Sequence, residues 1–260
     1  MQRRSLIPLA LLFVALGSMA QAPDWKKIRI GVEGAYPPFS EIGADGQIKG
    51  FEIDLARAWC AQMKAECVLV QQEFDGMIPA LQARKIDVVV ASMSITEARQ
   101  KVIAFAGPYM RNPSHFAGRA DAKLVFTAEG LKGKRIGVQR STIHNAYVER
   151  TFPHNEIVRY ASQDQVFLDL KAGRLDLVLA DQAAIDLGFL SRPDGKGFAF
   201  VGPNIDDPIF GLGSGVGMRK ADAALLAPKF SAAMKAVAAD GTFKKLNAKY
   251  FPYSIAPPNQ

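Results

Sequence analysis

The run Asp87-Val88-Val89-Val90-Ala91 decides the fold class of this chain. An unbroken series of β-branched residues, bounded by polar residues, is typical of a short strand that is buried on both faces. Parallel sheets covered by helices on both sides contain such strands, whereas a strand with one wet face alternates apolar and polar residues. The run therefore predicts an α/β protein with a mostly parallel sheet.

Strand and helix patterns alternate before and after this run. Apolar residues at helical spacing predict helices, and short β-branched runs predict the strands between them. The predicted strands are Lys27–Val32, Val68–Val70, Arg135–Val138, Ile157–Val158, Leu175–Ala180 and Gly213–Met218. The predicted helices are Phe51–Met63, Met77–Ala83, Ile143–Arg150, Gln165–Ala172, Ala183–Leu190, Ala221–Ala239 and Thr242–Tyr250. Repeated strand–helix–strand units imply parallel sheets with right-handed crossovers.

Two proline-bearing segments, Tyr109–Pro113 and Gly202–Pro208, divide this pattern into two units. We expect the residues after the second segment to rejoin the first unit. Lobe 1 would then comprise residues 23–111 and 207–260, and lobe 2 residues 112–206. Two strands that cross between lobes form a hinge beside a cleft. Periodicity alone leaves one continuous doubly wound sheet as the alternative.

Residues 1–22 have the pattern of a secretion signal. A basic start at Arg3 and Arg4 precedes the apolar run Leu6–Leu16, and Ala20-Gln21-Ala22 has the small residues that a signal peptidase recognises. The alternative is a membrane anchor, but a membrane-spanning helix needs about 20 apolar residues. The sequence therefore predicts cleavage after Ala22 and a periplasmic product.

Composition and charge narrow the function further. With 49% apolar and 22% charged residues, the chain has the composition of a globular protein rather than a disordered one. The leader contains two arginines and no acid, so its removal lowers the net charge from +7 to +5. We do not attribute this charge to nucleic-acid binding, because the product is expected outside the cytoplasm. Export also favours a disulfide between Cys60 and Cys67, and no further Cys or His stands nearby to form a metal site.

Motifs for catalysis are missing from the sequence. It contains no G-x-S-x-G elbow, no H-E-x-x-H zinc motif and no phosphate-binding G-x-x-x-x-G-K-[ST] loop. The glycine-rich run Gly211–Gly217 leads into a strand, so it predicts a close backbone approach rather than a nucleotide loop. We therefore expect neither a metal nor a cofactor.

Polar and aromatic residues instead follow the predicted strands, at the edge where open α/β sheets bind ligands. Arg99 can hold a carboxylate through two hydrogen bonds, Asp181 can accept from an α-ammonium group, and Glu33 can accept from a distal cation. Tyr36 and Phe74 can flank the stem between them. Taken singly, each residue has a structural alternative, such as a cap or a surface charge. Together they predict a site for an amino acid that carries an additional cation.

The chain resembles the bacterial extracellular solute-binding proteins of family 3, the periplasmic amino-acid receptors of ABC importers. The resemblance rests on ordered motifs along the mature chain: Gly31–Phe39, Gly50–Leu55, Phe74–Leu81, Ser92–Arg99, Gly173–Asp176 and Asp240–Thr242. Lysine/arginine/ornithine- and histidine-binding members resemble it most, and they carry a matching Cys-x6-Cys disulfide.

The resemblance implies a two-lobed periplasmic binding protein of type II with a two-strand hinge, acting as a monomer that delivers its ligand to a membrane permease. The implied ligand-binding residues are Glu33, Tyr36, Phe74, Ser92, Met93, Ser94, Arg99, Ser141, Thr142 and Asp181. Basic amino-acid binders often carry Asp at the position of Glu33, and some carry Ser at that of Ala91. Opine receptors resemble this chain at both positions, so an opine is an alternative ligand. A periplasmic enzyme resembling cyclohexadienyl dehydratase is the alternative from another class, although the sequence offers no evident proton-donating Lys beside the motifs.

Overall fold

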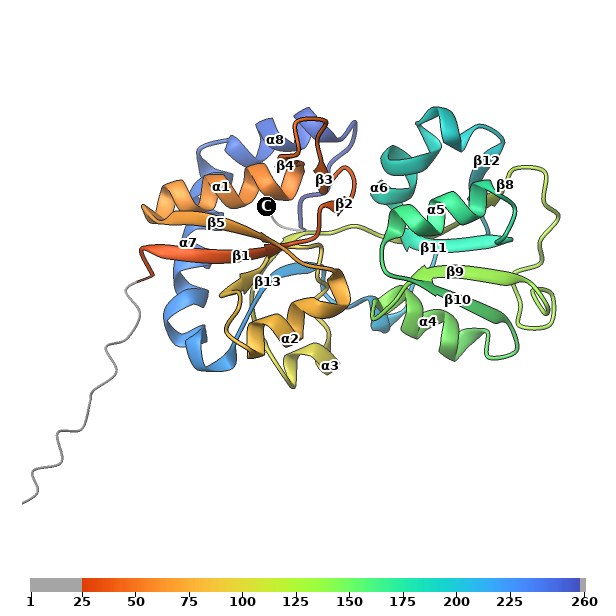
Figure 1. Ribbon diagram of the computed structural model, residues 1–260, viewed down its shortest axis with the longest axis horizontal. Helices are drawn as coiled ribbons and strands as arrows, with labels where there is room; N and C mark the ends of the chain where they lie inside the picture. The colour runs from red at the N-terminus through yellow and green to blue at the C-terminus, as the bar shows by residue number, and fades with distance from the viewer. Residues whose placement is uncertain (1–24, 258–260) are drawn as a thin grey trace, which may run out of the picture.

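The computed structural model describes residues 25–257, which form two lobes lying side by side (Figure 1). The predicted signal peptide and its cleavage after Ala22 fall outside these residues. Within the described range, no helix has both the length and the apolar character needed to cross a membrane.

The first lobe is built on a five-stranded sheet in the order β5-β1-β6-β13-β7. Its strands are β1 (Lys27–Val32), β5 (Glu66–Gln71), β6 (Val88–Val89), β7 (Ala104–Met110) and β13 (Ser214–Met218). Strand β1 pairs in parallel with β5 and β6, while β13 runs antiparallel to β6 and β7. Its helices are α1 (Phe51–Met63), α2 (Met77–Gln82), α3 (Glu97–Gln100), α7 (Ala223–Ala239) and α8 (Thr242–Tyr250). Helices α1, α7 and α8 share one core with β1, and α2 belongs to a second core.

The second lobe repeats this arrangement in the order β10-β9-β11-β8-β12. Its strands are β8 (Ser114–Arg119), β9 (Arg135–Gln139), β10 (Glu156–Tyr160), β11 (Leu177–Asp181) and β12 (Phe198–Val201). Strands β9, β10 and β11 are parallel, and β8 runs antiparallel to β11 and β12. Helices α4 (Ile143–Thr151) and α5 (Gln163–Lys171) belong to separate cores, so both faces of the sheet are covered. The two-lobed α/β fold expected from the sequence is confirmed.

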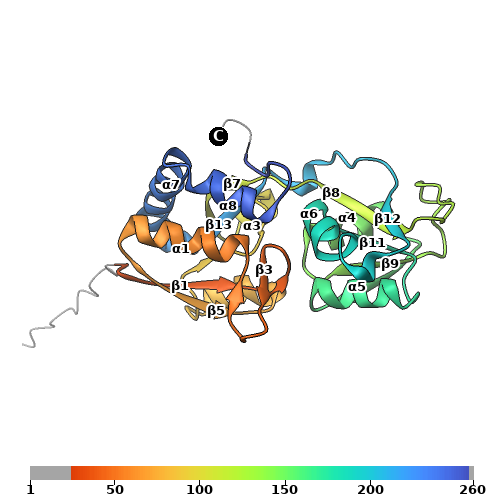
Figure 2. The ribbon, with the colours of Figure 1, turned by 90° about the horizontal axis from the view of Figure 1, so that it is seen from above.

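Two segments connect the lobes (Figures 1 and 2). The first passes from β7 to β8 through residues 111–113, and the second passes from β12 to β13 through residues 202–213. The proposed lobe boundaries, 111/112 and 206/207, fall within these connections. Gly213, in the second, has φ +108°, and a Cβ atom there would lie 2.6 Å from the carbonyl oxygen of Met110. The close approach predicted for the glycine-rich run is therefore present.

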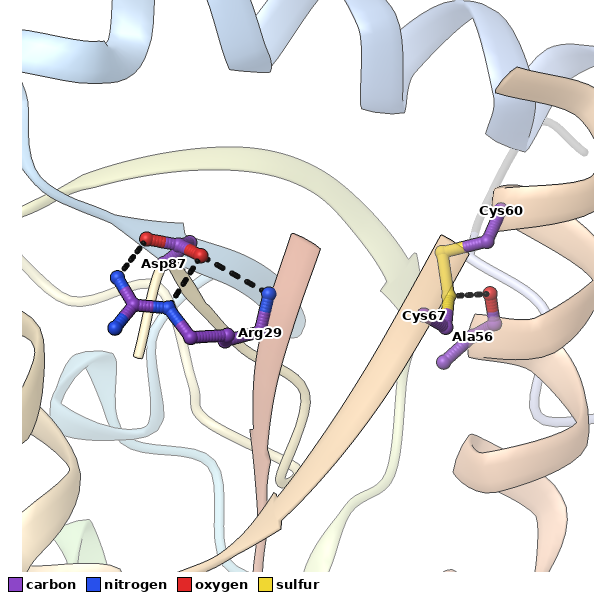
Figure 3. Close-up of a disulfide and its surroundings, with 5 residues drawn as sticks. All are labelled: Arg29, Ala56, Cys60, Cys67 and Asp87. Atoms are coloured by element: carbon purple, nitrogen blue, oxygen red, sulfur yellow. Dashed lines mark hydrogen bonds and ion pairs between the residues drawn. A yellow bond between two sulfur atoms is a disulfide. The ribbon is translucent and has the colours of Figure 1, made fainter. Parts of the chain in front are cut away.

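The disulfide between Cys60 and Cys67 is present and joins α1 to β5 (Figure 3). The two Cα atoms are 6.0 Å apart. Nearby, Arg29 on β1 donates to Asp87 at the start of the valine run, with distances of 2.9 Å from Nε and 2.7 Å from Nη2. The disulfide fixes the outer edge of the sheet, and the ion pair fixes β1 against the neighbouring strand.

Several elements differ from the prediction. The ladder of β6 covers only Val88–Val89, because the backbone turns at Ser92, whose φ is 50°. The predicted helix Ala183–Leu190 is divided into α6 (Gln182–Ile185) and a π-helical turn, Asp186–Leu190. Strands β7, β8 and β12 were not predicted. Nor was the small antiparallel sheet of β2 (Ala35–Tyr36), β3 (Ser40–Ile42) and β4 (Ile48–Lys49), which holds Tyr36 at the edge of the cleft.

Candidate functional site

A narrow cavity of about 20 Å³ lies between the lobes, where strands of both sheets end. Eight of the ten predicted ligand-binding residues line it: Glu33, Tyr36, Phe74, Ser92, Ser94, Arg99, Thr142 and Asp181. Four further residues complete the lining, namely Ala91, Gln139, Ile143 and His144. The structure therefore brings together side chains that are far apart in the sequence.

Arg99 is the cation of this cavity, and α3 positions it. Thr96 caps α3 by accepting the backbone N–H of Arg99 through its hydroxyl at 3.2 Å. The guanidinium lies over the ring of Phe74, 5.3 Å from the centroid, and donates to the carbonyl oxygens of Ser94 at 3.1 Å and Ser141 at 3.4 Å. Burial lowers the pKa of Arg99 to about 10, and the charge of Asp181 offsets part of this effect. A planar cation that is held only by carbonyls and a ring can still bind a carboxylate.

Asp181 is one of the two anions that line this cavity, and it is the last residue of strand β11. Its Oδ2 accepts the hydroxyl of Tyr36 at 2.8 Å, a bond that spans the two lobes. Nε2 of His144 lies 3.5 Å from Oδ1 of Asp181 and 3.0 Å from Oγ of Ser114. The carboxylate is thus oriented by two side chains, Tyr36 and His144, and it also lines the cavity.

Glu33 is the second anion, and it follows β1. Its side chain is only 5% exposed, and Nε2 of Gln139 donates to its Oε1 at 2.5 Å. Burial raises the pKa of Glu33 to about 8, although the bond from Gln139 acts in the opposite direction. A buried carboxylate with an uncharged partner is costly, so this end of the cavity favours a ligand cation.

The buried carboxyl group of Glu52 holds the backbone of Ser92 in position. Its backbone N–H donates to Oε1 of Glu52 at 2.7 Å, and the hydroxyl of Tyr109 donates to the same oxygen. Glu52 is 1% exposed, and burial raises its pKa to about 7. The hydroxyl of Ser92 is buried beside the same carboxyl and lowers its pKa.

Thr142 and Ser141 form the turn that leads into α4. Thr142 is the N-cap: its hydroxyl accepts the N–H of Asn145 at 3.1 Å and donates to the carbonyl of Gln139 at 2.7 Å. Ser141 has φ 62° and an exposed side chain, and it contributes its carbonyl oxygen to Arg99. The remaining predicted residue, Met93, is 1% exposed and packs in the core beside α2 instead of lining the cavity.

Three side chains in or beside the cavity were not predicted from the sequence: Gln139, His144 and Glu52. Gln139 and His144 lie two residues before Ser141 and two residues after Thr142, but they carry no charge pattern that predicts a place in the cleft. Glu52 lies in the motif Gly50–Leu55 and was not given a role. The described residues contain no group of three or more His, Cys, Asp or Glu side chains placed to hold a metal ion.

Comparison with known proteins agrees with this geometry. Residues 28–253 match the family model of the bacterial extracellular solute-binding proteins, family 3. The chain is 44% identical to the L-arginine-binding protein of Pseudomonas aeruginosa, over 95% of this chain and 97% of that protein. It is 40% identical to the lysine/arginine/ornithine-binding periplasmic protein of Escherichia coli, over 97% and 98% of the two chains. A solved ancestral arginine-binding protein bound to glutamine superposes with a TM-score of 0.80 at 32% identity, over 88% of this chain and 99% of that one.

Proposed function

The chain belongs to the bacterial extracellular solute-binding proteins, family 3, and on this premise we propose that it is a periplasmic receptor that captures a cationic amino acid for an ABC importer. In this proposal the mature protein begins after Ala22, acts as a monomer and delivers its ligand to a membrane permease. The eight predicted residues that line the cavity form the binding site, and Gln139, His144 and Glu52 assist them.

One observation carries the proposal: a guanidinium and two carboxylates, contributed by both lobes, line one cavity. Arg99 and Glu33 come from the first lobe, and Asp181 comes from the second. In residues 25–257, neither Arg99 nor Glu33 forms an ion pair with another side chain. A ligand with a carboxylate, an α-ammonium group and a distal cation supplies the opposite charge to each of the three.

Closure of the lobes supplies the selectivity. Arg99 takes the ligand carboxylate, Asp181 takes the α-ammonium group, and Glu33 takes the distal cation, while Tyr36 and Phe74 flank the aliphatic stem. A ligand that lacks one of these charges leaves a protein charge buried without a partner, which costs about 1–3 kcal/mol or more. Because the ligand contacts both lobes, it favours the closed form.

An opine is the alternative to a single amino acid as the ligand. It carries an amino acid together with the carbon skeleton of a keto acid. The positions of Glu33 and Ala91 keep the opine as a second candidate, because both residues line the cavity.

We propose binding rather than catalysis, because the relatives described above are binding proteins. Incubation with prephenate or arogenate tests this directly, and the formation of product would contradict it.

A thermal-shift panel of arginine, lysine, ornithine, histidine, octopine and glutamine tests the proposed ligand class. At a ligand concentration 100 times Kd, binding stabilises the folded protein by about 2.7 kcal/mol. For a domain of this size, that corresponds to a rise in Tm of about 5–10 °C. We expect a cationic amino acid to give the largest rise. A panel in which no cationic amino acid raises Tm would contradict the proposal.

A further inference from the structure

Glu33 is held in the closed cleft by an uncharged contact between the lobes. Gln139 lies on β9 in the second lobe, and its amide donates both to Oε1 of Glu33, at 2.5 Å, and to the carbonyl oxygen of Ala161, at 3.1 Å. Both of these partners are acceptors, so the NH₂ group of the amide must face them. No other hydrogen bond reaches the carboxyl of Glu33 in the part of the chain that the structure describes.

The charged groups packed around Glu33 are mostly negative. Glu52 on α1, Asp75 beside α2 and Asp164 on α5 all act on it as like charges, and so disfavour its ionised form. The hydroxyl of Tyr36 on β2 donates to Asp181 on β11 and not to Glu33.

The nearby cations are engaged elsewhere. Arg99 on α3 donates to the carbonyls of Ser94 and Ser141. Arg140, at the end of β9, pairs with Glu73 and Asp75, each at 2.6 Å. His144 on α4 faces Asp181. Among residues 25–257, therefore, no cationic side chain pairs with Glu33 when the lobes are closed.

An ionised carboxyl that is buried without a cation is expensive, so the closed cleft must supply one positive charge beside Glu33. Either the distal cation of the ligand or a proton can fill this role. The pKa of Glu33, which burial raises to about 8, agrees with the second possibility.

We propose that a proton and the ligand's distal cation are alternatives at Glu33, so that the cleft also accepts neutral amino acids of similar shape when Glu33 is protonated. This inference rests on the proposed function and adds a second ligand class to the same site. A carboxylic acid can donate to the carbonyl of an amide or ureido group, and the carboxylate can accept from an ammonium or guanidinium group. Closure around a neutral ligand therefore takes up one proton more than closure around a cationic one.

Linkage gives the size of the effect, and it does not depend on the pKa of Glu33 in the open form. If the two complexes differ by one bound proton, the ratio of their affinities changes by about tenfold per pH unit. The change extends below about pH 8, where Glu33 is protonated in the closed form without a ligand cation. A lower pH therefore reduces the ratio of the affinity for the cationic ligand to the affinity for the neutral one.

Isothermal calorimetry with L-arginine and its neutral isostere L-citrulline tests the proposal. If the thermal-shift panel shows lysine to bind more tightly, lysine and glutamine replace this pair. Titrations at pH 8, 7 and 6, each in two buffers of different ionisation enthalpy, give both the affinity and the protons exchanged. We expect citrulline to take up about one proton more than arginine at pH 7, and the arginine-to-citrulline affinity ratio to fall about 50-fold from pH 8 to pH 6.

The variant Glu33→Gln should lose this pH dependence, because it cannot ionise, while its side chain still accepts from Gln139. Glu66→Gln is the matched control: Glu66 lies at an exposed ion pair with Lys27, away from the cavity, and the variant should behave as the wild type. Three results would overturn the inference: equal proton exchange for the two ligands, an affinity ratio that does not change with pH, or no citrulline binding at pH 6. Arginine binding in the same experiments would still support the proposed function. Failure of every cationic amino acid to bind would overturn both.

Discussion

The exchange of Asp181 for asparagine removes one charge from the cavity with little change in shape. Asp181 is 7% exposed, and the asparagine amide oxygen can still accept the hydroxyl of Tyr36, which lies 2.8 Å from Oδ2. What is lost is a charge-assisted bond to the ligand's α-ammonium group. Such a bond contributes about 1.5–3 kcal/mol, and a buried pair that loses one partner costs about 3–5 kcal/mol. We therefore expect the Kd for the cationic ligand to rise at least tenfold and by as much as several thousandfold.

Calorimetry on Asp181→Asn, with the Tm of the ligand-free protein measured alongside, is the assay. The ligand-free variant should melt close to the wild type, because its amide oxygen still accepts from Tyr36 and Asp181 forms no ion pair with a Lys or Arg of residues 25–257. Asp194→Asn is the matched control, since Asp194 pairs with Lys171 on the exposed surface of the same lobe. Affinity of Asp181→Asn within twofold of the wild type, in a protein with an unchanged melting curve, would refute the role of Asp181.

Two further predictions concern closure and stability. Arg140→Gln removes the ion pairs with Glu73 and Asp75 that join the lobes outside the cavity. Because exposed ion pairs contribute about 0.2–1 kcal/mol each, we expect Kd to rise two- to tenfold. This rise should be smaller in 0.5 M salt, which screens exposed charges. Arg174→Gln breaks a pair within one lobe and serves as control; an equal loss of affinity there, or no salt dependence for Arg140→Gln, would contradict this role. Replacement of both Cys60 and Cys67 by serine removes the covalent link between two residues that are seven positions apart. We expect the free energy of unfolding, measured by urea denaturation, to fall by about 2–3 kcal/mol while the ligand affinity stays unchanged. An unchanged free energy of unfolding would show that the disulfide does not constrain the unfolded chain.

Much of the fold could be predicted because its elements carry local periodicity. Helices α1 and α8 and strand β1 have the predicted bounds, since each presents one apolar face or alternates regularly. Strands β7 and β12 were missed for the opposite reason. Gly107 and Pro108 interrupt the pattern of β7, and β12 contains only four residues. Their antiparallel partners are supplied by β13 and β8, the strands that follow the crossings between the lobes.

The charged residues of the site could also be predicted, because they follow strands whose ends must meet at one edge. Gln139 could not, since its partner Glu33 lies 106 residues away and in the other lobe. The role of Glu52 could not be predicted either, because its bond to Ser92 depends on a left-handed turn that no local sequence pattern predicts. Supporting residues of this kind are fixed by tertiary packing, and only the folded chain reveals them.

A crystal structure of the protein with its tightest cationic amino acid tests the central claim most directly. We predict the ligand carboxylate on Arg99, the α-ammonium group on Asp181 and the distal cation on Glu33, with Gln139 still donating to that carboxyl. A ligand bound outside this cavity, or one whose distal cation faces away from Glu33, would contradict the account.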